Sequence, residues 1–157
     1  MKDLDSIVSD NAKAASPHIV RTPDGRFTVL AAVLIGRKDV ADILTTCFEG
    51  GSNYWIGKVE RRGEASFDVE GFEAGDKDRW HSHFCAAGGS LLITEDEEGG
   101  SGKPNPLTLT ADDLVRGIVL AASHYKRDVR AWLDDCPDAG ESDVALQFAV
   151  FGEIVYG

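Results

Sequence analysis

The apolar residues of this chain change their spacing along its length, and this change constrains the fold more than any other feature. Short apolar runs rich in β-branched residues, at 27–35 and 90–94, have the length of strands. Two longer stretches instead place apolar residues three and four positions apart, which is the period of one helix face. The first covers residues 37–48 and the second begins at Thr110. The sequence therefore predicts an α+β fold.

The boundaries of the two predicted helices carry ordinary signals. The first helix places one apolar face on Val40, Ile43, Leu44, Cys47 and Phe48. The glycine pair 50–51 follows as a C-terminal stop. Thr110 and Asp113 resemble a capping box at the start of the second helix, which is expected to run toward Trp132 or to break near Asp128. A third helix is expected after the turn at 136–140, with Ser142 as its cap.

Further short strands are expected at 54–60 and 107–109, so that the chain forms a small mixed sheet with about three helices packed on it. Its 157 residues match one ordinary domain, and we expect a single domain over 1–157. Residues 1–25 lack a sustained pattern and are expected to form a poorly ordered arm.

The charge balance limits the classes of partner. The chain has 27 acidic and 16 basic residues, a net charge of −11, so it repels phosphate backbones and no direct nucleic-acid binding is expected without a local basic patch. Three cysteines do not make a disulfide framework. No signal-peptide core or membrane-spanning run is seen, which predicts a cytoplasmic location and no membrane partner.

One candidate ligand site is the turn Glu49-Gly50-Gly51-Ser52-Asn53-Tyr54-Trp55. Asn53 offers both a donor and an acceptor, and Tyr54 and Trp55 offer stacking faces with polar tips, which would suit a planar ligand such as a nucleobase. Glu49, Asn53, Tyr54 and Trp55 are therefore the candidate binding residues. The alternative, which we favour, is structural: the glycines stop a helix and send Trp55 into the core.

A weaker candidate for chemistry is the cluster His81, His83 and Cys85. If these residues lie on a strand, their side chains point to one side and could face one metal ion. A zinc site needs a fourth ligand, and no CxxC or HExxH motif is present. The alternative is a polar strand edge with an incidentally buried cysteine, so no metal and no cofactor are expected.

An acidic run precedes and enters the third predicted helix. It consists of Asp134, Asp135, Asp138, Glu141 and Asp143. The run lacks the residue order of a calcium loop, so it is either a solvated turn or a negative patch for a basic protein surface. Residues 95–98 form a second acidic candidate of the same kind.

Four blocks of sequence share an order with a known group. They are Phe48 to Trp55, Gly88-Gly89-Ser90-Leu91, Leu107-Thr108-Leu109 and the C-terminal Phe151-Gly152-Glu153-Ile154-Val155-Tyr156-Gly157. In this order they resemble a group of uncharacterised small phage and prophage proteins, over roughly residues 38–157. The resemblance implies a mobile-element context and no reaction, and the histidines at 81 and 83 are not part of the shared pattern.

These observations favour a non-catalytic phage-type binding protein over an enzyme. We expect it to dock on a host protein with a basic surface, a defence component being one candidate, through an acidic and aromatic surface. The first alternative is a protein that sequesters a nucleotide or similar ligand at the Glu49–Trp55 turn. The second is a metal-dependent enzyme that uses His81, His83 and Cys85. The oligomeric state and the identity of the partner are left open.

Overall fold

The chain divides into two compact units, Met1–Leu34 and Ile35–Gly157. The computed structural model describes residues 18–21, 27–30, 33–65, 77–96 and 105–157. In the first unit, strand β1 (His18–Arg21) pairs antiparallel with β2 (Phe27–Leu30). The strand expected over 27–35 is shorter than predicted, because Val33 and Leu34 lie outside it with exposed side chains. Apart from His18–Arg21, the expected arm over 1–25 lies outside the described residues.

The second unit contains a three-stranded sheet in the order β3 (Ile56–Arg62), β4 (Ser90–Glu95), β5 (Leu107–Leu109). Both pairings are antiparallel, with Val59 opposite Ile93 and Leu91 opposite Leu109, so the expectation of a mixed sheet is wrong for these strands. The described helices are α2 (Arg37–Thr46), α3 (Lys77–Ala86), α4 (Ala111–His124), α5 (Val129–Asp134) and α6 (Ala139–Phe151), with a π-helical turn η1 (Cys47–Gly51) after α2.

The α+β class is confirmed, with five helices in the described residues where about three were expected. One extra helix arises because the predicted second helix breaks. It ends at His124, and Asp128 caps a separate α5 by accepting hydrogen bonds from the backbone N–H groups of Arg130 and Ala131. Asp138, not Ser142, caps α6 and forms a capping box with Glu141. The predicted box of Thr110 and Asp113 is present on α4.

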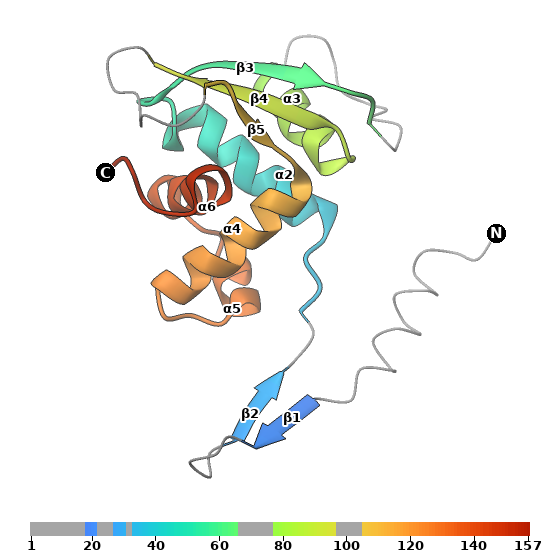
Figure 1. Ribbon diagram of the computed structural model, residues 1–157, viewed down its shortest axis with the longest axis vertical. Coiled ribbons are helices and arrows are strands. Elements are labelled where there is room, and N and C mark those ends of the chain that lie inside the picture. The colour runs from blue at the N-terminus through green and yellow to red at the C-terminus, as the bar shows by residue number, and fades with distance from the viewer. Residues whose placement is uncertain (1–17, 22–26, 31–32, 66–76, 97–104) are drawn as a thin grey trace, which may run out of the picture. The chain divides into compact units, whose positions relative to one another are not determined.

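The core of this unit lies between the sheet and helices α2, α4 and α6, which Figure 1 shows on one side of the strands. Alternate residues of β4 point into it, so that Leu91 and Ile93 are fully buried. The predicted helix faces are confirmed, because Ile43, Leu44, Leu114 and Ile118 are buried, and Phe48 is half-buried. Among the described residues, no helix combines the length and apolarity needed to cross a membrane.

Two glycines allow α6 to approach its neighbours closely. A Cβ atom at Gly117 on α4 would lie 2.1 Å from the carbonyl oxygen of Ala145, and one at Gly51 would lie 2.5 Å from that of Ala139. Neither contact leaves room for any other residue. By contrast, a Cβ atom at Gly50 would meet nothing within 4 Å. The start and the middle of α6 are therefore fixed by backbone contacts that only glycine permits.

Candidate functional site

A buried carboxylate, Asp143 on α6, connects the Glu49–Trp55 turn to α6. Its side chain is 4% exposed, although charged groups are seldom buried without partners. Oδ1 accepts hydrogen bonds from Ser52 Oγ at 2.6 Å and from Trp55 Nε1 at 2.8 Å. Oδ2 accepts from Tyr54 OH at 2.8 Å and from Gln147 Nε2 at 2.6 Å. Four donors thus replace the water that burial removes.

The neighbouring amide of Gln147 holds the C-terminal tail. Its Oε1 accepts hydrogen bonds from the backbone N–H groups of Val155 and Tyr156, both at 2.7 Å. Its Nε2 donates to the carbonyl oxygen of Tyr156 at 2.8 Å, besides donating to Asp143. These partners fix which end of the amide faces which group. Gln147 is fully buried, so it works as a rigid link between α6 and the tail.

The aromatic rings of the turn and the tail pack on one another. The planes of Trp55 and Tyr156 are 6° from parallel with centroids 5.4 Å apart, and Trp55 also contacts Phe151 at 5.4 Å. The Tyr156 hydroxyl donates to a carboxylate oxygen of Glu95, which is buried at the end of β4. Because Trp55 is 2% exposed, the structural interpretation of this residue is confirmed, and it has no face open to a planar ligand.

Tyr54 differs from Trp55, because its side chain is 53% exposed although its hydroxyl is fixed. Partial burial, together with the hydrogen bond to the negative Asp143, raises the pKa of the Tyr54 hydroxyl to about 12. Ile154 and Val155 of the tail are exposed by 40% and 36%. Tyr54, Ile154 and Val155 form what we call the turn–tail patch. Glu49 and Asn53, the other candidate residues of the turn, are also exposed.

The acidic run is mostly engaged within the protein. Asp134 pairs with Arg130, and Arg127 pairs with Asp135 and, at 3.7 Å, with Glu141. Asp138 accepts a hydrogen bond from the Glu141 backbone at 2.9 Å as the cap of α6. Asp143 is buried and adds nothing to an acidic surface, so its assignment to that surface is corrected. The run therefore presents less free negative charge than its sequence indicates.

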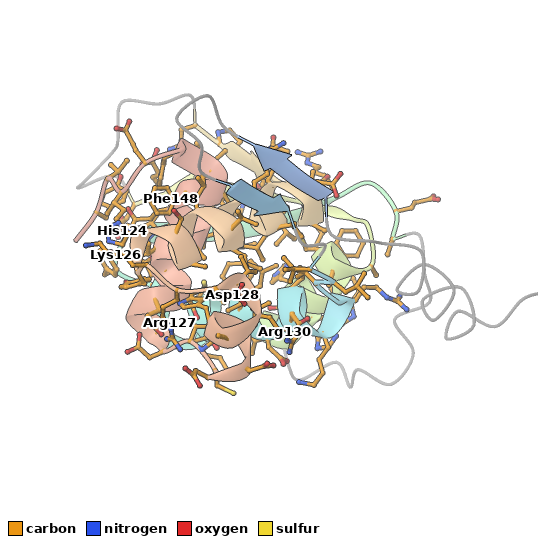
Figure 2. All side chains as sticks on the ribbon, turned by 90° about the horizontal axis from the view of Figure 1, so that it is seen from below. His124, Lys126, Arg127, Asp128, Arg130 and Phe148 are labelled. Carbon is orange, nitrogen blue, oxygen red and sulfur yellow. The ribbon has the colours of Figure 1, made fainter. Side chains whose placement is uncertain are left out.

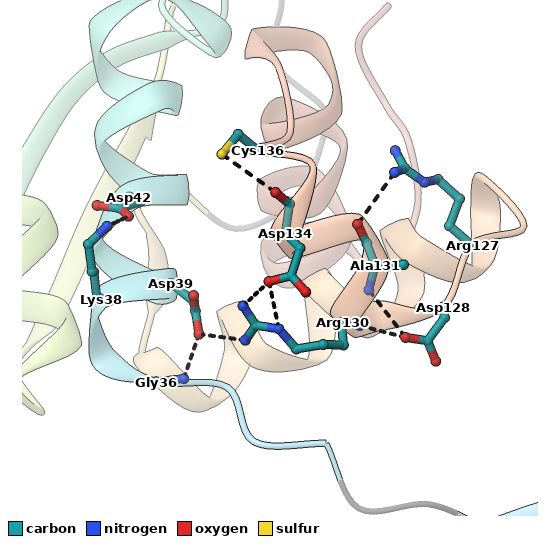
Figure 3. A network of polar contacts seen from close by, with 10 residues as sticks. All are labelled: Gly36, Lys38, Asp39, Asp42, Arg127, Asp128, Arg130, Ala131, Asp134 and Cys136. Carbon is teal, nitrogen blue, oxygen red and sulfur yellow. Dashed lines mark hydrogen bonds and ion pairs between the residues drawn. The ribbon is translucent and has the colours of Figure 1, made fainter.

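Arg130 extends this network to another helix, as Figure 3 shows. Its guanidinium donates to Asp134 through Nε at 2.8 Å and lies 3.7 Å from Asp39 at the start of α2. The hydrogen bond from Arg130 holds the pKa of Asp134 below its usual value. Asp39 also accepts from the Gly36 backbone at 2.8 Å. These exposed pairs position α5 against α2 more than they stabilise the fold, since surface ion pairs contribute little.

The basic residues at the end of α4 lie beside this network. Figure 2 shows His124, Lys126, Arg127 and Arg130, with His124 next to Phe148 of α6. The His124 ring packs edge-on against Phe148 and Tyr125, at centroid distances of 6.0 and 5.1 Å. Since Arg127 and Arg130 are both paired with carboxylates, this corner serves to join helices.

The strand expected to carry His81, His83 and Cys85 is wrong, because these residues lie on α3. On a helix, positions two apart point in nearly opposite directions, so His83 does not share a face with the other two. Cys85 is fully buried, and burial raises the pKa of its thiol to about 12, which disfavours the thiolate that binds metal. In the described part of the chain, no three metal-ligating side chains gather in one place.

Two adjoining hollows lie between β3 and α3. One, of about 280 Å³, is lined by residues that include Asn53, Lys58 and His81. The other, of about 480 Å³, includes Arg61, Trp80 and His81. Val59 and His81 line both hollows. Asn53 and His81, which the sequence suggested for two different chemistries, thus line the same hollow, and we call the two hollows together the groove between β3 and α3.

Sequence reasoning missed Gln147 and Glu95 as parts of the turn–tail arrangement. A glutamine in the middle of a helix has no local signal, because apart from Asp143, four residues earlier, its partners lie 8 to 93 residues away. The only available signal was that the Trp55 turn and the tail both carry aromatic residues. In comparisons with models of known families, with characterised proteins and with solved structures, the chain matches none.

Proposed function

We propose that this protein is a non-catalytic binding protein that docks on another protein through the turn–tail patch. The observation that carries the proposal is the fixed position of an exposed tyrosine. The Tyr54 hydroxyl is bound by Asp143, and the Gln147 amide beside it holds the backbone of Val155. An exposed aromatic side chain that is already ordered loses little conformational entropy when a partner covers it. Tyrosine is also enriched among the residues that dominate binding energy.

The partner we propose presents an apolar depression bordered by basic residues. The charge of this chain supports that choice. The first 34 residues contain four basic and four acidic residues, so the whole excess of 11 negative charges belongs to Ile35–Gly157. An acidic unit steers a basic surface toward itself at long range, whereas the short-range contacts are made by apolar and aromatic groups. The resemblance to phage and prophage proteins adds the expectation that the partner is a host protein.

The test is a kinetic binding assay on the partner recovered with the wild-type protein. Tyr54→Ala and Val155→Asp should each weaken binding by at least about tenfold, mainly through faster dissociation. Val119→Ala is the control, because Val119 is exposed to a similar extent (45%) but belongs to α4 and is not one of the patch residues. Tyr54→Phe separates the ring from the hydroxyl, and it should retain more binding than Tyr54→Ala.

The salt dependence tests the electrostatic part separately. Raising the ionic strength from roughly 0.01 M to roughly 0.15 M shortens the Debye length from about 30 Å to about 8 Å, so association should slow. Dissociation should change less, since it depends on close contacts. Capture of the same proteins in the same amounts by wild type and by the Tyr54→Ala, Val155→Asp double variant would reject the docking proposal.

A further inference from the structure

The groove between β3 and α3 contains an arginine that differs from the others in its surroundings. Arg116, Arg127 and Arg130 each form an ion pair with at least one carboxylate. Arg61 and Arg62, the last residues of β3, form none with the described residues. Both are exposed. In a chain with a net charge of −11, two neighbouring arginines that no carboxylate in the described part of the chain pairs with are a local concentration of positive charge.

Arg61 is held in place by aromatic rings. Its Cζ lies 3.1 Å from the centroid of the Trp80 ring, and Trp80 in turn stacks on Phe84 with planes 9° apart and centroids 5.5 Å apart. Phe84 is buried, and a Cβ atom at Gly89 would strike its ring, so the base of this stack cannot shift easily. The Arg61 Cζ also lies 6.0 Å from the centroid of the Phe84 ring, so the guanidinium lies over this pair of rings and is positioned by cation–π contact.

The other groups along the groove fit a ligand with an anionic end and a planar end. Lys58 lies in the first hollow, and its ammonium is 3.3 Å from the carboxylate of Glu60, which lines the second hollow. Asn53 supplies amide donors and an acceptor in the first hollow, and His81 lines both hollows. Phe48, Ile56 and Val59 give the first hollow an apolar wall. The hollows, about 280 and 480 Å³, are near the size range of ligand pockets, about 300–1,000 Å³.

From this geometry we infer that the groove binds a small phosphorylated molecule with one planar ring, of the nucleoside monophosphate type, and that Arg61 binds its phosphate. A guanidinium with a free N–H edge binds phosphate through two parallel hydrogen bonds. The ring lies against the apolar wall near Asn53. The site goes beyond protein docking and uses none of the three residues of the turn–tail patch. The same chemistry occurs at the end of a single-stranded oligonucleotide, which the experiment includes as a separate probe.

The experiment is a titration of the full chain with adenosine monophosphate, followed by tryptophan fluorescence and calorimetry. Trp80 is half-buried, whereas Trp55 and Trp132 are 2% and 0% exposed, so a fluorescence change reports mainly on the groove. Inorganic phosphate and adenosine should each bind more weakly than the nucleotide. We expect a short oligothymidylate strand to bind no more tightly than adenosine monophosphate, as for a small-molecule site. Tighter binding that increases with strand length would overturn the small-molecule assignment.

The variants assign the role of Arg61. Arg61→Gln should weaken binding of adenosine monophosphate by at least about tenfold, and Arg61→Lys, which keeps the charge without the planar fork, should fall between it and wild type. Arg116→Gln on α4 is the matched control and should bind like wild type. Circular dichroism with a thermal melt checks that the variants fold. Failure of wild type to bind the nucleotide at millimolar concentration, or equal binding by Arg61→Gln and wild type, would overturn the proposal.

Discussion

Trp55 and Tyr156, separated by a hundred residues of chain, stack with their rings 6° from parallel and 5.4 Å apart. Their polar atoms bind two different buried carboxylates, because Trp55 Nε1 donates to Asp143 and the Tyr156 hydroxyl donates to Glu95. Offset ring stacking adds about 0.5–1.5 kcal/mol to the burial of the two side chains. The pair joins the end of α6 to the end of β4, and it places the exposed tail next to Tyr54.

Replacing Asp143 with alanine should destabilise the protein strongly. The change leaves the buried donors of Ser52, Trp55 and Gln147 without their acceptor, and one such donor costs about 1–3 kcal/mol. We expect the free energy of unfolding to fall by about 3 kcal/mol or more, measured by urea denaturation. Asp134→Ala, at an exposed carboxylate of the same acidic run, is the control and should leave the midpoint nearly unchanged. Equal midpoints for the two variants would contradict the buried network.

Replacing Gln147 with methionine, which has a similar length but no amide, should release the C-terminal tail. In the wild type, the backbone N–H groups of Val155 and Tyr156 both donate to Gln147 Oε1. Hydrogen exchange at these two amides should become much faster in the variant, while exchange in α4 stays slow. Unchanged protection at Val155 and Tyr156 would show that the tail is held by other contacts.

Replacing Gly117, at the contact between α4 and α6, and Gly140, within α6, by alanine should change the stability in opposite directions. Gly117→Ala should destabilise the protein by about 1 kcal/mol or more, because crowding against the Ala145 carbonyl outweighs the better helix propensity. In Gly140→Ala the nearest atom is 3.5 Å from the new Cβ, so the variant should be as stable as wild type or up to about 1 kcal/mol more stable. Thermal denaturation of both variants checks the α4–α6 crossing, and a stabilised Gly117→Ala would contradict it.

Tyr54 should make the stability depend on alkaline pH. Its hydroxyl has a pKa of about 12 in the folded protein and an ordinary value of 10.0, so the unfolded chain releases this proton first. The contribution of Tyr54 is therefore complete below pH 10 and is lost as the pH rises from about 10 to about 12. Tyrosine ionisation can be followed by ultraviolet absorbance as the pH is raised. Subtracting the titration curve of Tyr54→Phe from that of the wild type should leave the titration of one hydroxyl with this raised pKa. A difference titration centred near 10 would mean that the hydroxyl is not held by Asp143.

The sequence predicts those features of the fold that depend on neighbouring residues. The apolar faces of α2 and α4, the capping box at Thr110 and the short strands β4 and β5 all follow from local spacing. The alternation His81, His83, Cys85 suggests a strand, although these residues lie on α3, because polar residues on a half-buried helix give no clear apolar period. The sequence leaves open whether the second helix breaks at Asp128, because an aspartate fits both an exposed position on a helix and an N-cap.

The candidate site depends on contacts that no local pattern contains. Asp143 sits within an acidic run and was assigned to the surface, but its four donors come from the turn 88 to 91 residues earlier and from Gln147. Burial of a charged residue is decided by these distant partners rather than by its own neighbours in sequence. The same holds for Arg61, whose position over the Trp80 ring depends on the packing of α3 against β3.

The close approach of Gly51 to Ala139 gives the adjacent glycines unequal roles. The first, Gly50, faces open space, whereas the second has the carbonyl oxygen of Ala139 where a side chain would begin. In a library that randomises both codons, position 50 should accept most amino acids and position 51 should return glycine alone. Of the two glycines, therefore, only Gly51 is sterically required. The residue that imposes this requirement is Ala139, the first residue of α6, which lies 88 positions later in the chain.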